Sequence, residues 1–295
     1  MTIDEIQASF AKNGYLADRD LATVLHLSLV LNRPLLLEGE AGVGKTEVAR
    51  VLAKSLDAPL IRLQCYEGLD VNSAVYEWDY PRQMLAIRML EAKGKAAGAD
   101  TRSIFTEEFL IRRPLLAALS SEGKKAPVLL IDEVDRADEE FEAFLLEILS
   151  DFAVTIPEIG TIRAEHPPRV IITSNRTREV HDALKRRCLF HWIDYPTAER
   201  ELAILELRQP GLSGALAREV VDFVQRLRGA DLAKVPGIAE TLDWSAALVA
   251  LNTKRLSAEQ IDRTLGALLK YQEDLSAIRG SGAAKMLDEV RAAAR

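Results

Sequence analysis

Short apolar runs alternate with segments of helical periodicity over the first two thirds of the chain. Between two of these runs, apolar residues recur at i, i+3, i+4, i+7 and i+8 over 138–149, which is the spacing of one buried helical face. Strands that alternate with helices form a parallel sheet covered by those helices. The pattern therefore predicts an α/β fold with a five-stranded parallel sheet. Its expected strands are 34–37, 60–65, 128–132, 169–175 and 190–195.

The strand signal ends near Pro196. Beyond it, segments such as 217–227 and 258–271 have helical character almost to the end of the sequence. At roughly 150 residues per domain, 295 residues allow two domains. We therefore expect an α/β unit over 1–196 and a small all-helical unit over 197–295.

A long stretch, 66–113, separates the second and third expected strands and has the character of an insertion. Its segment 93–98 contains Lys and Gly and is expected to be partly mobile. Tyr76, Trp78 and Tyr80 indicate either interior packing or an aromatic surface for a protein partner. The acidic residues between them disfavour stacking on nucleic-acid bases.

Composition and charge narrow the class of protein. Hydrophobic residues make up 48% of the chain and charged residues 28%, which is ordinary for a globular protein and excludes collagen-like or globally disordered chains. Lys and Arg number 38 against 45 Asp and Glu, so the net charge is −7, the wrong sign for a general nucleic-acid binder. We therefore expect no nucleic-acid partner.

The cysteines and the apolar segments indicate the cellular compartment in which the protein is expected. Cys65 and Cys188 lack the spacing of a disulfide framework, a CxxC redox motif or a zinc site. The acidic N-terminus is not typical of a signal peptide. The most apolar stretch, 21–37, is interrupted by polar residues and a proline, so it falls short of the ~20 apolar residues of a membrane helix. We expect a cytoplasmic protein with no cleavable leader and no transmembrane segment.

The most specific motif joins the first expected strand to a helix expected over 46–56. Residues 39–46 read GEAGVGKT and match GxxxxGK[ST], a loop whose backbone N–H groups and helix N-terminus bind phosphates. Lys45 is expected to meet the β and γ phosphates, and Thr46 to ligate Mg²⁺. ATP is favoured over GTP, because Arg255 stands where the guanine-reading NKxD motif needs Asp. The residues expected to contact the nucleotide here are Gly39, Glu40, Ala41, Gly42, Val43, Gly44, Lys45, Thr46 and Glu47.

The third expected strand ends in two acids, Asp132 and Glu133. We expect Asp132 to hold Mg²⁺ and Glu133 to accept a proton from the water that attacks the γ phosphate. This predicts hydrolysis in addition to binding. The alternative is that these acids, with Asp135, only begin the next acidic helix, where negative charge is favourable.

Two further groups are candidates for the same site. Asn175 ends the fourth expected strand, where it either orients the attacking water or only forms a turn. Arg186 and Arg187 end a short helix before the fifth. They are either solvated partners of the helix dipole or an arginine finger that reaches the γ phosphate of a neighbouring subunit.

This ordered set of motifs resembles the AAA+ ATPases over nearly the whole chain, with a P-loop NTPase sheet, an insertion in helix 2 and a helical lid domain. The segments 132–137 and 144–147, the hairpin-like 154–163 and the insertion at 66–113 resemble the MoxR group. More narrowly, 175–179 and 186–196 resemble the MoxR-type accessory ATPases of carbon monoxide dehydrogenase operons, the CoxD-like proteins.

The resemblance implies a hexameric ring with ATP bound between subunits. It also implies a partner protein with a von Willebrand factor A domain and a chaperone-like role in maturation of a molybdenum hydroxylase, the client metalloenzyme. Two other functions stay open: a nucleic-acid-linked AAA+ motor of restriction or helicase type, and a nucleotide switch that does not hydrolyse ATP.

The resemblance also assigns residues. Asn175 takes the sensor 1 role, and Arg186 or Arg187 the finger role, with Arg186 preferred by its distance from 194–196. Tyr15 and Leu16 stand where the chain of this family passes the adenine. One departure concerns the lid helix, which has no sensor 2 arginine over 237–244.

Overall fold

The computed structural model describes residues 1–92, 104–121 and 125–293. The chain forms two compact units. The first comprises residues 1–13, 17–38 and 46–192, and the second comprises residues 14–16, 39–45 and 193–295. The segment 93–98, expected to be partly mobile, lies outside the described residues.

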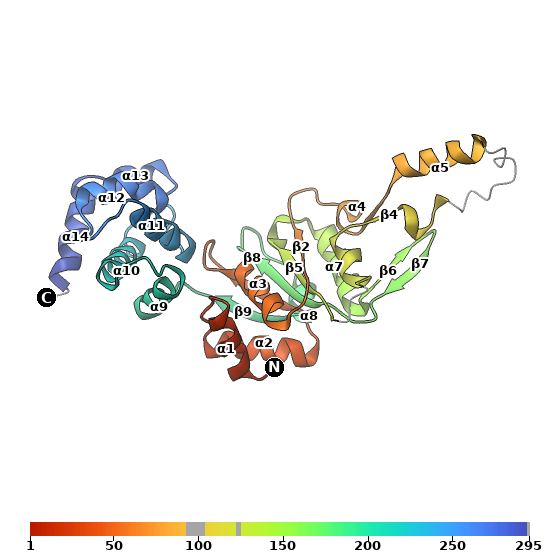
Figure 1. Ribbon diagram of the computed structural model, residues 1–295, viewed down its shortest axis with the longest axis horizontal. Helices are drawn as coiled ribbons and strands as arrows, with labels where there is room; N and C mark the ends of the chain where they lie inside the picture. The colour runs from red at the N-terminus through yellow and green to blue at the C-terminus, as the bar shows by residue number, and fades with distance from the viewer. Residues whose placement is uncertain (93–103, 122–124, 294–295) are drawn as a thin grey trace. The chain divides into compact units, whose positions relative to one another are not determined.

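The first unit is built on a five-stranded parallel sheet with the strand order β2-β5-β8-β1-β9 (Figure 1). This confirms the fold class expected from the alternating pattern. The strands β1 and β5 are buried along their whole length, as their unbroken apolar runs require. The bounds are β1 (Leu35–Gly39), β2 (Leu60–Gln64), β5 (Val128–Asp132), β8 (Arg169–Ser174) and β9 (Leu189–Ile193).

The strand register brings polar residues to one edge of this sheet. Gln64 at the end of β2 lies opposite Asp132 at the end of β5. Glu38 in β1 lies opposite Ser174 at the end of β8. The carboxyl ends of parallel strands are the usual position of a ligand site in such sheets.

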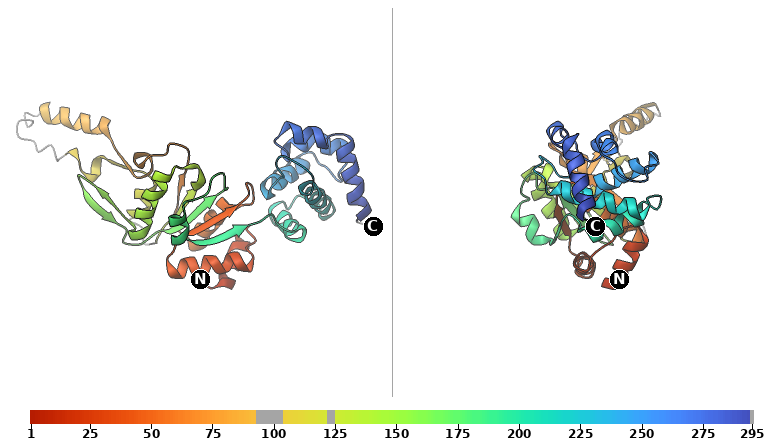
Figure 2. Two further views of the ribbon diagram at one scale, coloured as in Figure 1. Left: turned by 180° about the vertical axis from the view of Figure 1, so that it is seen from behind. Right: turned by 90° about the vertical axis from the view of Figure 1, so that its left-hand side faces the viewer.

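Several helices of the first unit begin beside a polar side chain that accepts a hydrogen bond from a backbone N–H group of the first turn. Thr2 and Glu5 form a capping box on the first helix, and Asp18 and Asp138 accept hydrogen bonds from backbone N–H groups of the helices that follow them. Between α7 (Glu139–Asp151) and β8, the antiparallel pair β6 (Ala153–Ile156) and β7 (Gly160–Arg163) confirms the expected hairpin (Figure 2). The helices are α1 (Ile3–Lys12), α2 (Arg19–Leu31), α3 (Lys45–Leu56), α6 (Pro114–Leu119), α7 (Glu139–Asp151) and α8 (Asp182–Arg187), with a 3-10 turn at η3 (Val134–Arg136).

The expected insertion forms a small antiparallel pair with a projecting helix. Trp78 is buried and packs edge-on against Tyr76 and Phe105, with ring centroids 6.1 and 5.2 Å away. A shared aromatic surface of Tyr76, Trp78 and Tyr80 is therefore wrong, because only Tyr80 is well exposed, at 64%. The elements are α4 (Val71–Ala74), β3 (Tyr76–Trp78), α5 (Tyr80–Ala92), η2 (Glu107–Phe109) and β4 (Leu110–Arg112).

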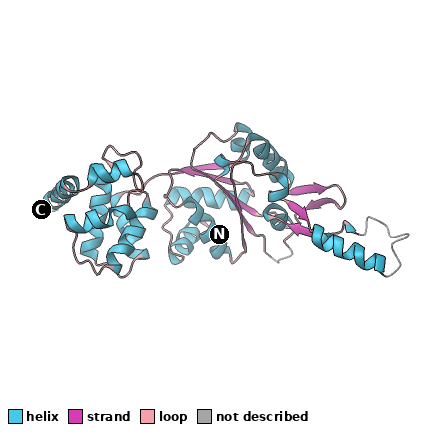
Figure 3. Ribbon diagram, turned by 90° about the horizontal axis from the view of Figure 1, so that it is seen from above, coloured by secondary structure: helices cyan, strands magenta, loops and turns pink. Residues whose placement is uncertain are grey.

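From residue 193 onward the second unit is helical in its described part (Figure 3). Its core centres on Trp244, which packs against Phe223 with 5.5 Å between ring centroids. The helix expected over 258–271 stops early, because Gly266 weakens it and the Lys270 ammonium donates to the carbonyls of Gly266 and Ala267. The elements are α9 (Ala198–Arg208), α10 (Gly214–Arg228), α11 (Ile238–Ala250), α12 (Ala258–Thr264), η4 (Leu265–Ala267), α13 (Gln272–Ile278) and α14 (Ser281–Ala293).

Candidate functional site

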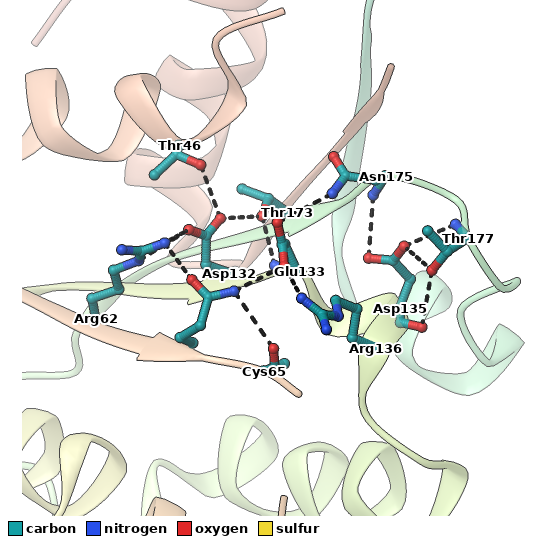
Figure 4. Close-up of polar contacts among 11 residues, drawn as sticks. Thr46, Arg62, Cys65, Asp132, Glu133, Asp135, Arg136, Thr173, Asn175 and Thr177 are labelled. Atoms are coloured by element: carbon teal, nitrogen blue, oxygen red, sulfur yellow. Dashed lines mark hydrogen bonds and ion pairs between the residues drawn. The ribbon is translucent and has the colours of Figure 1, made fainter. Parts of the chain in front are cut away.

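Asp132 is the centre of a polar cluster at the carboxyl edge of the sheet (Figure 4). Its side chain is 2% exposed. Its Oδ1 accepts hydrogen bonds from the hydroxyls of Thr46, at 3.0 Å, and Thr173, at 2.6 Å. Its Oδ2 accepts from the Arg62 guanidinium, at 3.0 Å from Nε and 2.5 Å from Nη2. Three elements thus hold one buried carboxylate in place.

Glu133 adopts the left-handed conformation, with φ of 57°. This backbone costs a residue other than glycine roughly 1–2 kcal/mol. The Thr173 hydroxyl accepts from the Glu133 N–H at 2.9 Å and so stabilises the turn. The carboxylate accepts from Gln64 Nε2 at 3.0 Å, Arg136 Nη1 at 3.2 Å and Asn175 Nδ2 at 3.4 Å. The turn therefore directs a partly exposed carboxylate toward the amide of Asn175.

Asp135 fixes the start of the loop that follows β8. Its carboxylate accepts from the Asn175 N–H at 3.2 Å, the Thr177 N–H at 2.8 Å and the Thr177 hydroxyl at 2.7 Å. The same loop is held further along by Glu142 of α7, which accepts from Arg178 and from the His181 N–H. Both acids are buried, so the loop that carries Asn175 is tied to the segment after Glu133.

The glycine-rich loop 39–45 has the backbone that its motif predicts. Gly42 and Gly44 have φ of +80° and +98°, which side chains rarely permit. Lys45 is buried, and its Nζ donates to the carbonyls of Gly39 and Glu40, both at 2.7 Å. Because an ammonium has three donors on a flexible stem, it can also turn to a phosphate oxygen.

The other expected nucleotide contacts fall around this loop. A Cβ on Gly44 would lie 3.6 Å from the ring of Tyr15. The Leu16 carbonyl accepts from Arg200 of α9 at 2.9 Å. Glu47 lies in the first turn of α3 and pairs with Arg50 at 3.7 Å. Tyr15 is thus beside the loop.

Arg186 and Arg187 lie in the exposed last turn of α8. Their carbonyls accept from the Arg33 side chain, at 2.8 and 3.2 Å. Within the described part of the chain, neither of their own guanidinium groups makes a hydrogen bond or ion pair. Both side chains are therefore available to a partner outside this chain.

Sequence reasoning missed the roles of Arg62, Gln64, Thr173 and Asp135. Arg62 and Gln64 occupy alternate positions in β2 and so face the same side of the sheet. Two polar residues at this spacing in an otherwise apolar strand are the sequence feature that could have indicated their role in the site. Arg62 and Gln64 meet the acids because β2 lies beside β5 in the sheet, and this strand order cannot be read from the sequence.

The thiol of Cys65 is buried and lies within the electrostatic influence of the acids. Burial raises its pKa to about 12, and the negative charges of Asp132 and Asp135 act in the same direction. A thiol with such a pKa stays protonated near neutral pH and is a poor nucleophile. Cys65 is therefore not a candidate nucleophile.

The oxygen ligands suit magnesium. Thr46 Oγ1 and Asp132 Oδ1 are 3.0 Å apart, and Mg²⁺ prefers such hard oxygens, usually one or two from the protein with the rest from phosphate and water. Among the residues that the structure describes, no group of three or more His, Cys, Asp or Glu side chains could hold a metal ion by itself.

The described residues also include no helix that is long and apolar enough to cross a membrane.

Residues 34–188, just over half of the chain, match the model of the AAA domain, dynein-related subfamily. The chain belongs to this family. The match to the AAA domain begins before β1 and ends after α8, so it includes the glycine-rich loop, both acids and the loop of Asn175.

Two bacterial proteins of uncharacterised function are similar to this AAA protein in sequence. YeaC of Bacillus subtilis is 27% identical over 220 residues, which are 70% of this chain and 59% of that protein. SH1500 of Staphylococcus haemolyticus is 24% identical over 281 residues, 92% of this chain and 97% of that protein. A point mutant of Thermotoga maritima RuvB is similar in fold, with a TM-score of 0.51 and 17% identity over 90% of this chain and 72% of that one.

Proposed function

We propose that this AAA protein hydrolyses ATP and uses the energy to remodel a protein partner. The observation that carries the proposal is the convergence of Asp132, Glu133, Thr46 and Asn175 at one sheet edge. A nucleotide-binding loop alone would account for binding. A second acid held beside a strand-end amide supports hydrolysis as well.

Each residue has a definite part in this proposal. Backbone N–H groups of the loop 39–45 and the Lys45 ammonium bind the phosphates. Thr46 and Asp132 would hold Mg²⁺, which neutralises charge on the β and γ phosphates when it is bound. Glu133 takes a proton from water while Asn175 orients that water, so that oxygen bonds to the γ phosphorus, the bond to the bridging oxygen breaks, and ADP leaves.

The test is Glu133→Gln. We expect this variant to bind ATP about as tightly as the wild type and to turn it over at least about 100-fold more slowly, because the amide cannot accept the proton. Binding is measured by equilibrium dialysis with labelled ATP, and turnover by phosphate release. Glu140→Gln, an exposed acid in the first turn of α7, is the matched control.

Unchanged turnover in Glu133→Gln would remove this residue as the base. Tight ATP binding with no phosphate release, in the wild type as in the variant, would instead indicate a nucleotide switch. The two outcomes are distinct because binding and hydrolysis are measured separately.

At a finer level, we infer a MoxR-type protein that forms a hexameric ring and works with a von Willebrand factor A protein on a metalloenzyme client, such as a molybdenum-containing carbon monoxide dehydrogenase. Support comes from the resemblance of 132–137 and 154–163, from the insertion between β2 and β5, and from the match to the dynein-related AAA subfamily. Client activity after co-expression with wild type or Glu133→Gln tests this role. Equal metal content and activity of the client in both would reject it.

A further inference from the structure

The glycine-rich loop is in direct backbone contact with the start of α11, and both belong to the second compact unit. The Ala239 N–H donates to the Gly42 carbonyl at 3.0 Å. A Cβ on Gly237 would lie 2.8 Å from the Gly42 carbonyl carbon and 2.9 Å from the Ala41 oxygen, closer than side chains tolerate. The first turn of α11 therefore sits against the main chain of the loop.

A buried ion pair holds this turn of α11 in place. Arg228 of α10 donates to both carboxylate oxygens of Glu201, each at 2.7 Å, and Glu201 is 0% exposed. The Arg228 Nε also donates to the Pro236 carbonyl at 2.8 Å, and the Thr241 hydroxyl donates to Glu201 at 2.8 Å. The residues on both sides of 237–240 are thus fixed, because breaking one partner of a buried pair is costly.

The contact has a consequence for the N–H groups of the loop. In a trans peptide the carbonyl of one residue and the N–H of the next point in opposite directions. The described peptides are trans. With the Gly42 carbonyl bonded to Ala239 on one side, the Val43 N–H is directed to the other side, away from α11. A donor of the phosphate-binding segment is therefore oriented by a contact from a helix about 200 residues later in the chain.

We propose that the first turn of α11 is a positioning element for the phosphate-binding loop, with Gly237 and the Ala239 N–H as the contacting groups. The helical unit then raises nucleotide affinity through its backbone, although residues 237–244 contain no arginine. The proposal rests on the proposed nucleotide binding by 39–45. It adds that this binding needs the contact with α11.

The first test is Gly237→Ala. The φ of Gly237 is −82°, so alanine is compatible with the backbone conformation, and its added Cβ meets the main chain of the loop. We expect the Kd for a fluorescent ADP analogue with Mg²⁺ to rise about tenfold, since a strained contact and a weakened hydrogen bond act together. Gly214→Ala, in the first turn of α10 with no atom near the added Cβ, is the matched control and should bind like the wild type.

A second pair removes the donor itself. Ala239→Pro takes away the N–H that Gly42 accepts, and proline is tolerated in the first turn of a helix. Ala215→Pro is the same position in α10, where the residue is exposed. We expect a raised KM for ATP with kcat within about twofold of wild type for Ala239→Pro, because the contact acts on ground-state binding. A loss of structure alone would not separate KM from kcat in this way.

The outcomes are decisive. If Gly237→Ala and Ala239→Pro keep their fold by circular dichroism and bind ADP as tightly as their controls, the positioning proposal is overturned. If one of the two variants unfolds, the comparison is made with the other. If both unfold while both controls fold, the contact is needed for folding, and the proposal that it acts only by positioning the loop is overturned. If the wild type itself binds no ADP, it is the proposed nucleotide binding that fails.

Discussion

The two buried thiols, Cys65 and Cys188, make the stability of the fold sensitive to alkaline pH. Burial raises the pKa of each to about 12, and for Cys188 this outweighs the opposing charge of Arg33. In the unfolded chain a thiol titrates near pH 8.5. Above about pH 8.5 the unfolded chain therefore loses protons that the folded chain keeps. The stabilisation is complete below this pH and is lost as the pH rises toward the folded pKa values.

We expect the free energy of unfolding to fall by up to about 1.4 kcal/mol per pH unit for each thiol above about pH 9. The measurement is urea unfolding at a series of pH values. The double variant Cys65→Ala/Cys188→Ala should show a shallower slope, although its stability at neutral pH is lower. Equal slopes for the two proteins would mean that the thiols do not keep their protons in the folded state.

The loop after β8 is an element whose geometry depends on Asp135. In Asp135→Ala, the N–H groups of Asn175 and Thr177 lose their acceptor. We expect stability to fall by about 2–4 kcal/mol, since several buried hydrogen bonds are lost. Turnover should fall at least about tenfold, because Asn175 is no longer held beside Glu133. Urea unfolding and phosphate release measure the two effects.

Asp138→Ala is the matched control for this loop. Asp138 lies three positions further along, and its side chain caps α7 by accepting from the Phe141 N–H at 2.8 Å. Its loss should cost about 1 kcal/mol of stability. Among the hydrogen bonds of the described residues, none joins the Asp138 side chain to the loop of Asn175, so turnover should stay near wild type. A similar loss of turnover in both variants would show that general destabilisation, and not the loop, is responsible.

The elements differ in how far sequence predicts them. The strands β1 and β5 are buried on both faces, so their apolar runs identify them within two residues. The loop 39–45 is equally easy to predict from the sequence, because Gly42 and Gly44 adopt positive φ angles that other residues rarely adopt. The contacts of Arg62 with Asp132 and of Ala239 with Gly42 join distant segments through strand order and helix packing. No local pattern contains that information.

At the scale of the whole molecule, Arg186 and Arg187 are the residues that would make the site shared between subunits. In the described residues, the side chains that hydrogen-bond to the carboxylates of Asp132, Glu133 and Asp135 do not include Arg186 or Arg187. Arg186 and Arg187 are exposed on α8 instead. If they act on the nucleotide of a neighbouring subunit, the specific ATPase rate should climb with protein concentration and then saturate. A concentration series with parallel light scattering measures both rate and mass.

Mixing two inactive variants tests whether the arginine acts between subunits. Arg186→Ala and Arg187→Ala should lower turnover about 10³-fold if either is the finger, whereas Lys185→Ala, on the same helical turn, should not. Glu133→Gln keeps its arginines, and Arg186→Ala keeps its base. In a mixed ring, an intact Glu133 can therefore face an intact Arg186 from the neighbour, and activity should exceed that of either variant alone. Activity equal to the average of the two would mean that each subunit completes its own site, because no mixing could then restore it.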